Sequence, residues 1–399
     1  SIFGGSAWEW DGERMQYYLH NFLTEQPDLN FHNPAVRAAI LDVARFWLER
    51  GVDGFRLDVA NYYFHDAELR SNPPSGRTGP RPRDYQEHVY DRSRPETIDF
   101  LKALRALANE YGDRALIAEI DSDRPIERSL DYTSGDDRLH TAYNFFFLKK
   151  RDLTAAHIHE AFAPWTESGE VDAWPAWAFS NHDAPRAASR LLSAGADQTN
   201  DEAAAVLNAL LICLYGTIFL YQGEELGLPQ AEIAFEDLVD PEAIRFWPHT
   251  LGRDGCRTPM PWAGEAPNAG FSSAKPWLPV DPRHLARAAD RQSHAPASTL
   301  NRTREALRAR RALQALRSGR ITFLTGPTGT VAFARHSADE RCICAFNLTQ
   351  TSQRLALTES DAISKLREAV LLRSADARDG AIQLGPYGYG VWRAERQAD

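Results

Sequence analysis

Residues 51–66, GVDGFRLDVANYYFHD, place an arginine and an aspartate two positions apart at the end of a short apolar run. The run, which contains Val52, Phe55 and Leu57, is typical of a buried β-strand. Side chains alternate along a strand, so Arg56 and Asp58 leave it on the same side. A paired arginine keeps a buried aspartate ionised, which a carboxylate nucleophile requires. The same pair is also compatible with a structural ion pair that closes the end of a strand.

Two other segments carry side chains suited to acid–base chemistry. Glu119 ends the apolar run ALIA, and loss of hydration in such a site raises the pKa of a carboxyl group, so that it keeps its proton. His182 and Asp183 stand together in FSNHDAPR. Taken alone, Glu119 is also compatible with a carboxylate that caps a loop, and the His-Asp pair with a helix cap.

In their order and spacing, these three segments resemble the conserved strands of the α-amylase family, glycoside hydrolase family 13. GFRLD (54–58) resembles the strand of the nucleophile, ALIAE (115–119) the strand of the acid/base, and FSNHDAPR (179–186) the strand of the His-Asp pair. The flanking stretches 4–34 and 252–262 resemble the bacterial α-glucosidase and oligo-1,6-glucosidase branch. The resemblance extends over nearly the whole chain.

The resemblance implies catalytic roles for three carboxyl groups. Asp58 would be the nucleophile and Glu119 the acid/base, while Asp183 would accept hydrogen bonds from the hydroxyls of the reacting glucose. A retaining glycosidase needs its two principal carboxyl groups about 5 to 5.5 Å apart, and side chains that end neighbouring strands can meet that requirement. We therefore expect double displacement through a glucosyl-Asp58 intermediate.

The same resemblance implies sugar-binding roles for three further side chains. Arg56 is the neighbour of the nucleophile, and His182 would bind the hydroxyls of the reacting glucose. Arg186 would help to hold Asp183 or the glucose itself.

Residues around the nucleophile bear on linkage specificity. Val59 and the segment QPDLN (26–30) are features that the family associates with α-1,6 cleavage. The segments GGSAWEWD and RLDVANYYFHD instead resemble proteobacterial α-glucosidases that act on maltose-like α-1,4 disaccharides. Phe145 is a candidate for stacking on a sugar beyond the reacting ring, although aromatic clusters such as 62–64 and 145–147 more often pack in a core.

We expect a retaining α-glucosidase that releases glucose from the non-reducing end of short α-glucosides such as maltose and also transfers it to acceptor alcohols. Two alternatives within the family stay open: an oligo-1,6-glucosidase, and a glucosyltransferase that isomerises sucrose or trehalose. A different class is the non-catalytic amylase-fold partner of a membrane transporter. Such partners usually lack some of the carboxylates, whereas this sequence has Asp58, Glu119 and Asp183.

The elements that must position these side chains alternate along the chain. Helical periodicity is found at 34–50, 96–111, 153–162 and 201–214, and strand-like runs occur at 114–119, 139–148, 177–182 and 217–221. This alternation predicts an α/β fold with parallel strands and right-handed crossovers. Functional residues at the carboxyl ends of the strands are typical of a (β/α)8 TIM barrel. The resemblance implies that the barrel's N-terminal strands are missing from this chain.

Three regions are expected. Residues 1–33 would be the end of an inserted domain, and within them residues 1–30 are expected to form an irregular loop over the site. Residues 34–319 would be the later part of the catalytic barrel, with a loop subdomain at 61–95. Short strand-like runs divided by Gly, Asp and Ser predict an antiparallel β-sandwich domain at 320–399.

Composition limits the partners. The 399 residues carry a net charge of −10, which argues against nucleic acid and anionic membranes, and no apolar run is long enough to span a bilayer. The expected partners are a small α-glucoside, acceptor alcohols and the missing N-terminal segment, in a cytoplasmic monomer or homodimer. No cofactor is expected in this chain, and by resemblance a calcium-like ion would belong to the missing segment. The four cysteines are expected to be reduced thiols rather than metal ligands: Cys213, Cys256, Cys342 and Cys344.

Overall fold

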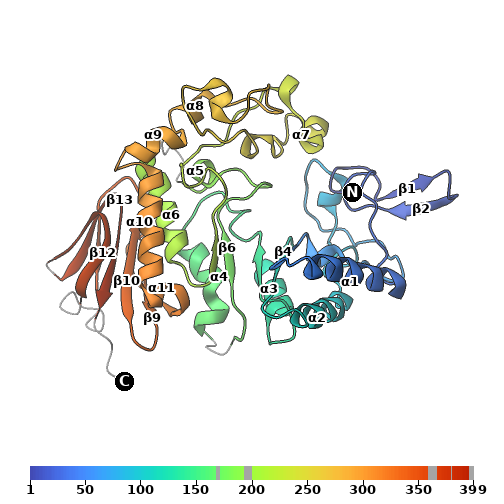
Figure 1. Cartoon of the computed structure of the whole chain (residues 1–399), viewed down its shortest axis with the longest axis horizontal. Coiled ribbons are helices and arrows are strands. Elements are labelled where there is room, and N and C mark those ends of the chain that lie inside the picture. The colour runs from blue at the N-terminus through green and yellow to red at the C-terminus, as the bar shows by residue number, and fades with distance from the viewer. Residues whose placement is uncertain (168–170, 193–199, 358–365, 379, 395–399) are drawn as a thin grey trace. The chain divides into compact units, whose positions relative to one another are not determined.

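The computed structural model describes residues 1–167, 171–192, 200–357, 366–378 and 380–394. These residues form two compact units, each described here by itself (Figure 1). The first unit comprises 1–145, 172–175 and 240–252. The second comprises the described parts of 146–171, 176–239 and 253–399.

The first unit is built on parallel strands β3 (Gly54–Leu57), β4 (Ala115–Ile120) and β5 (Thr141–Asn144), in the spatial order in which they occur along the chain. Its remaining elements are the antiparallel hairpin β1 (Trp8–Asp11) and β2 (Gln16–Leu19), the helices α1 (Pro34–Glu49), α2 (Glu96–Asn109), α3 (Pro125–Thr133) and α7 (Pro241–Phe246), and the 3₁₀ turns η1 (Ala60–Tyr62) and η2 (Pro82–Tyr85). The prediction of an irregular loop over residues 1–30 is therefore wrong for the hairpin, because its aromatic residues pair across two strands.

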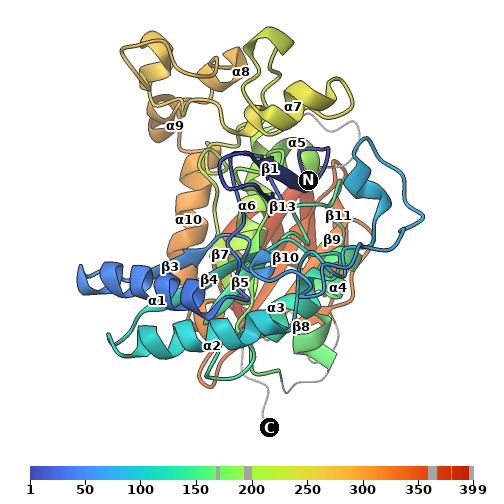
Figure 2. The same cartoon turned by 90° about the vertical axis from the view of Figure 1, so that its right-hand side faces the viewer.

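Helix α1 begins and ends where its sequence signals predict. The side chain of Asn33 accepts a hydrogen bond from the backbone N–H of Ala35, and Pro34 occupies the first helical position. Gly51, at a φ of 87°, follows the helix and turns the chain toward β3. Helices α1 and α2 run side by side (Figure 2).

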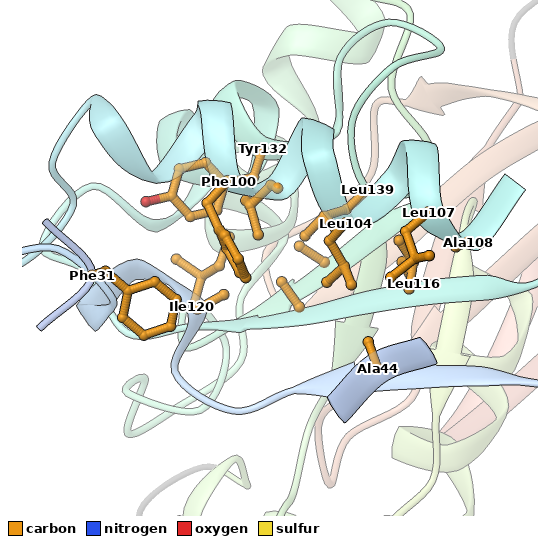
Figure 3. Close-up of a cluster of buried hydrophobic side chains, with 14 of the residues drawn as sticks. Phe31, Ala44, Phe100, Leu104, Leu107, Ala108, Leu116, Ile120, Tyr132 and Leu139 are labelled. Carbon is orange, nitrogen blue, oxygen red and sulfur yellow. The ribbon is translucent and has the colours of Figure 1, made fainter. Parts of the chain in front are cut away.

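The core of the first unit lies between α2 and β4. Figure 3 shows Leu104 and Leu107 of α2 directed toward Leu116 of β4. Burial of this apolar face fixes α2 on one side of the strand that carries Glu119. The strand is apolar except at Glu119, so its burial forces that carboxyl group into a site with little water.

The second unit begins with the remaining parallel strands, β6 (Ala176–Ala178) and β7 (Thr217–Phe219), which pair with each other. Its helices are α4 (Ala155–Glu167), α5 (Ala187–Arg190), α6 (Asp201–Cys213), α8 (Pro282–Leu285), α9 (Ala289–His294), α10 (Thr299–Ala312) and α11 (Gln314–Ser318), and its 3₁₀ turns are η3 (Phe235–Asp237), η4 (Asp254–Cys256) and η5 (Pro267–Gly270). Strands β5 and β6 are both shorter than predicted, because tight turns replace their ends.

An antiparallel sheet follows from residue 320, close to the predicted boundary. Its strands are β8 (Arg320–Leu324), β9 (Thr330–His336), β10 (Arg341–Asn347), β11 (Gln353–Ala356), β12 (Leu366–Arg378) and β13 (Ala381–Ala394). They follow the order β11-β13-β10-β9-β8, and β12 also pairs with β13. Figure 1 shows α10 and α6 beside this sheet.

A buried arginine joins the sheet to α6. Arg335 of β9 is inaccessible to solvent and donates hydrogen bonds of 2.7 Å to the carbonyl oxygens of Cys213 and Gly319. Cys213 ends α6, so the guanidinium satisfies a helix C-terminal carbonyl that has no partner within the helix. All four cysteines are buried free thiols, as expected. Within the described ranges, no helix is long and apolar enough to cross a membrane.

The close approach of β3 and β4 at Gly54 generates a prediction. Gly54 has a φ of 153°, and a Cβ atom there would lie 1.9 Å from the carbonyl oxygen of Ala115. Gly54→Ala should therefore force the two strands apart and lower the free energy of unfolding by about 3 kcal/mol. Urea unfolding would measure this loss. Gly12→Ala is the matched control, because its Cβ would meet no atom within 4 Å; an equal loss in both variants would contradict the interpretation.

Candidate active site

Strand register brings Asp58 and Glu119 to the same level. The Cα atom of Leu57 in β3 pairs with that of Ala118 in β4, and each carboxylic residue is the next along its strand. Parallel strands direct their carboxyl ends to one edge of a sheet, so both side chains lie at that edge. The sequence prediction that these two residues end neighbouring strands is confirmed.

A single arginine contacts both carboxyl groups. Arg56 forms an ion pair with Asp58, and its Nη2 atom lies 2.6 Å from Oε2 of Glu119. The same Nη2 donates a 2.8 Å hydrogen bond to the hydroxyl of Tyr143 in β5. The structure thus corrects the assignment of Arg56 to Asp58 alone. It also corrects the expectation of a buried pair, because the Asp58 side chain is 73% exposed.

Glu119 has the opposite environment. Its side chain is only 2% exposed, and it accepts hydrogen bonds from the Tyr143 hydroxyl (2.8 Å, to Oε1) and the Val59 backbone N–H (3.2 Å, to Oε2). Burial raises the pKa of Glu119 above its ordinary value, while the positive charge of Arg56 and the two hydrogen bonds act in the opposite direction. The predicted rise is confirmed, because burial outweighs these donors.

Val59 holds an unusual backbone conformation. Its φ and ψ angles are 33° and 52°, in the left-handed region that β-branched residues rarely adopt. This conformation turns its N–H toward Glu119. The structure therefore connects Val59 to Glu119 through its backbone, whereas its predicted contact with sugar stays a prediction.

A buried amide fastens the ends of β3 and β4 together. Asn61, inaccessible to solvent, donates a 2.7 Å hydrogen bond to the carbonyl oxygen of Asp121 and accepts one of 3.3 Å from its N–H. Arg92, from the loop at 61–95, donates to the Asp121 carboxylate at 3.1 Å and to the hydroxyl of Tyr62 at 2.9 Å. These contacts fix the backbone two residues beyond Glu119.

His182 and Asp183 lie in the second unit, in a turn after β6. The side-chain oxygen of Asn181 accepts hydrogen bonds of 2.9 Å from the N–H groups of Asp183 and Ala184. This turn ends the strand earlier than predicted and directs His182 Nε2 to within 3.2 Å of Asp183 Oδ2. The turn thus presents the imidazole and the carboxylate together.

Two arginines from residues 253–257 hold Asp183. Its Oδ1 lies 2.8 Å from Arg257 Nη2 and 3.4 Å from Arg253 Nη1. The structure corrects the expectation that Arg186 holds Asp183. Arg186 is 3% exposed and donates instead to the carbonyl oxygens of Gln222 (2.8 Å) and Cys256 (3.1 Å). It supports the 253–257 turn rather than the carboxylate, and burial lowers its pKa.

A buried glutamate, Glu224, supports the turn at 181–184 that carries His182 and Asp183. Glu224 accepts a 3.2 Å hydrogen bond from the Ser180 hydroxyl, which in turn accepts one of 2.8 Å from the N–H of Ala187. Burial raises the pKa of Glu224 to about 7. Through these contacts Glu224 is joined to residues on both sides of the turn at 181–184.

Two of the aromatic residues that the sequence offers for contact with a sugar have different surroundings. Tyr63 stacks on Phe31 with ring centroids 5.0 Å apart, which confirms the packing role expected for most of the cluster. Phe145 follows β5 directly and is half-buried, with its N–H bonded to the carbonyl oxygen of Ile120 at 3.3 Å. Its stacking on a sugar stays a prediction.

Sequence reasoning missed four residues that contact the catalytic candidates or their strands. Tyr143 stands opposite Glu119 in the register of β4 and β5, so its strand position was the available signal. Arg253 and Arg257 lie in GRDGCR, a stretch that indicates function only through its resemblance to the family, and Asn61 lies in a segment predicted to be a loop. Within the part of the chain that the structure describes, no group of three His, Cys, Asp or Glu residues could hold a metal ion.

Comparison with curated relatives places these residues in a family context. The family model described as "Alpha amylase, catalytic domain" matches residues 1–319. A probable alpha-glucosidase of Rhizobium meliloti (strain 1021) is 49% identical over 358 residues, which cover 88% of this chain and 64% of the relative. Maltase A1 of Drosophila melanogaster is 34% identical over 382 residues, which cover 90% of this chain and 64% of the relative. The chain therefore spans about two thirds of the length of these relatives.

Solved structures agree. The alpha-glucosyl transfer enzyme XgtA is similar with a TM-score of 0.91 and 42% sequence identity, over 99% of this chain and 74% of that chain. Isomaltulose synthase from Klebsiella sp. LX3 is similar with a TM-score of 0.85 and 26% sequence identity, over 99% of this chain and 75% of that chain. The predicted fold class, a (β/α)8 barrel followed by an antiparallel β domain, is confirmed. The chain belongs to the α-amylase family, glycoside hydrolase family 13.

Proposed function

We propose that this chain belongs to a retaining α-glucosidase that releases glucose from short α-glucosides such as maltose and also transfers it to acceptor alcohols. The observation that carries the proposal is the pair of unlike carboxyl groups at one sheet edge, the exposed Asp58 and the buried Glu119, joined by Arg56. The names of the similar proteins support it, since they include a probable alpha-glucosidase, a maltase and an alpha-glucosyl transfer enzyme.

In the first step of the proposed mechanism, the Asp58 carboxylate attacks the anomeric carbon while Glu119 gives its proton to the leaving oxygen. The bond between the anomeric carbon and that oxygen breaks, and a glucosyl ester of Asp58 forms. In the second step Glu119, now ionised, takes a proton from water or an alcohol, whose oxygen attacks the anomeric carbon and releases Asp58. Two carboxyl groups and the acceptor supply every atom and proton, so the proposed reaction needs no cofactor.

Asp183 is the proposed acceptor of hydrogen bonds from the glucose hydroxyls. Its Oδ1 is occupied by Arg257 and Arg253, which hold the carboxylate in one orientation. Oδ2 faces His182, a second polar group suited to a sugar hydroxyl. Fixed acceptors of this kind favour the transition state because they need no reorganisation as positive charge grows on the ring.

Linkage preference separates the proposed function from its nearest alternatives. An oligo-1,6-glucosidase of Parageobacillus thermoglucosidasius is 33% identical over 318 residues, and isomaltulose synthases are among the similar structures. An isomerase would return a disaccharide, a 1,6-glucosidase would prefer isomaltose, and a non-catalytic partner would release no sugar. Chromatography of the products from maltose, isomaltose and sucrose distinguishes them, and we expect glucose from maltose at the highest kcat/KM.

Removing the nucleophile tests the proposal directly. Asp58→Asn should lower kcat for maltose by about a thousandfold or more, because an amide cannot form the glucosyl ester. Asp53→Asn is the matched control. Asp53 lies just before β3, its side chain is 99% exposed, and its substitution removes the same negative charge. Asp58→Asn activity within tenfold of the wild type would contradict the assignment.

Replacing the acid should have an effect that depends on the leaving group. Glu119→Gln should reduce kcat/KM for maltose by about a thousandfold, and far less for nitrophenyl glucoside, whose leaving group needs no proton. The surface variant Glu110→Gln should leave both values unchanged. Equal losses for the two substrates in Glu119→Gln would mean that Glu119 is not the acid.

Transfer predicts a measurable partition of the intermediate. With nitrophenyl glucoside as donor, added glycerol should lower the release of glucose relative to nitrophenol and yield a glucosylglycerol, because both acceptors attack the same ester. Simultaneous measurement of nitrophenol and glucose gives the ratio. A ratio that stays at one at high glycerol would contradict transfer to this acceptor and leave hydrolysis in place.

A further inference from the structure

Tyr143 stands between the acid and the arginine. It pairs with Glu119 in the register of β4 and β5, and its side chain is buried. Its hydroxyl lies 2.8 Å from Glu119 Oε1 and 2.8 Å from Arg56 Nη2. Arg56 Nη2 also lies 2.6 Å from Glu119 Oε2, so the three groups form a closed cycle of polar contacts.

The chemistry of the cycle fixes the direction of the tyrosine's hydrogen bond. A guanidinium group can only donate, so the Tyr143 oxygen accepts from Arg56. Its one hydrogen is then donated to Glu119. Burial also raises the pKa of Tyr143, which keeps the hydroxyl protonated across the range in which glutamate titrates. Tyr143 is therefore a constant donor to the acid.

We propose that Tyr143 is a positioning residue that holds the Glu119 carboxyl group and sets the pH range over which it keeps its catalytic proton. The proposal rests on the proposed function, in which Glu119 is the acid. A donor to the carboxylate favours its ionised form, so Tyr143 offsets part of the effect of burial. Without it, Glu119 would hold its proton more firmly and return it less readily to the leaving oxygen.

Two other groups that face Glu119, Arg56 and the Val59 N–H, also favour its ionised form, so Tyr143 supplies one part of the effect. Arg56, from β3, divides its contacts between Glu119 and Asp58, and the N–H of Val59 is fixed by the backbone. The negative charge of Asp58 raises the pKa of Glu119 rather than lowering it. Burial raises the pKa of Tyr63 and the charge of Glu119 contributes to the rise, so the Tyr63 hydroxyl stays neutral where glutamate titrates, and its ring is packed on Phe31.

Tyr143→Phe tests the inference because it removes the hydroxyl and keeps the ring. Glutamate labelled with 13C at the side-chain carboxyl allows the titration of Glu119 to be followed by NMR, and its signal is identified by its loss in Glu119→Gln. We expect the midpoint to rise by about one pH unit, the scale of one hydrogen bond to a carboxylate. The basic limb of the pH profile of kcat/KM should move in the same direction, because the acid must be protonated.

Tyr62→Phe is the matched control. The Tyr62 hydroxyl is also buried in the first unit, but it bonds to Asp121 and Arg92 instead of Glu119. This variant should leave the Glu119 midpoint unchanged, and melting temperatures of both variants show whether the fold is kept. A midpoint that stays in place or falls in folded Tyr143→Phe overturns the proposal. A shifted midpoint in a protein that cleaves no α-glucoside supports the role of Tyr143 and overturns the proposed function instead.

Discussion

The ion pairs of Arg56 are the constraint on which the candidate site depends. One positive charge lies between two carboxyl groups, so the arginine alone cannot make one of them a nucleophile and the other an acid. The difference arises from hydration: Asp58 is 73% exposed, whereas Glu119 is 2% exposed. Asp58 keeps its contact with water and pairs with Arg56, while burial disfavours charge on Glu119. In the proposed mechanism, the apolar run that buries β4 therefore separates the role of the acid from that of the nucleophile, and Arg56 contacts both groups.

Backbone geometry makes this arrangement specific. The parallel register that pairs Leu57 with Ala118 brings the next residues of both strands to one level, and Gly54 permits the close approach of the strands at the other end. Beyond the carboxyl groups, Asn61 bonds to both backbone groups of Asp121. The two strands are thus fastened on both sides of Asp58 and Glu119, which restricts the separation of the two carboxyl groups, as the proposed double displacement requires.

Sequence reasoning succeeded where the signal is local. The ends of α1, the apolar face of β4 and the change to an antiparallel sheet near residue 320 follow from caps, periodicity and turn residues, which act within a few positions. It failed where contacts join distant segments. The strand pattern around Tyr143 predicts a strand, but it does not give the register that places its hydroxyl beside a glutamate 24 positions earlier. Family resemblance assigns Arg186 to Asp183 or to the glucose, but in the structure Arg186 donates to backbone carbonyl oxygens, and the arginines at 253 and 257 reach the carboxylate.

Asp58 and Glu119 serve hydrolysis and transfer alike in the proposed mechanism. In the proposed mechanism, water and an alcohol attack the same glucosyl ester, and Glu119 removes a proton from either one. Tyr143, Arg56 and the Val59 N–H surround Glu119, and they influence its basicity equally for both acceptors. Because both acceptors share the ester and the base in the proposed mechanism, the side chains that bind the acceptor are the groups that distinguish an alcohol from water.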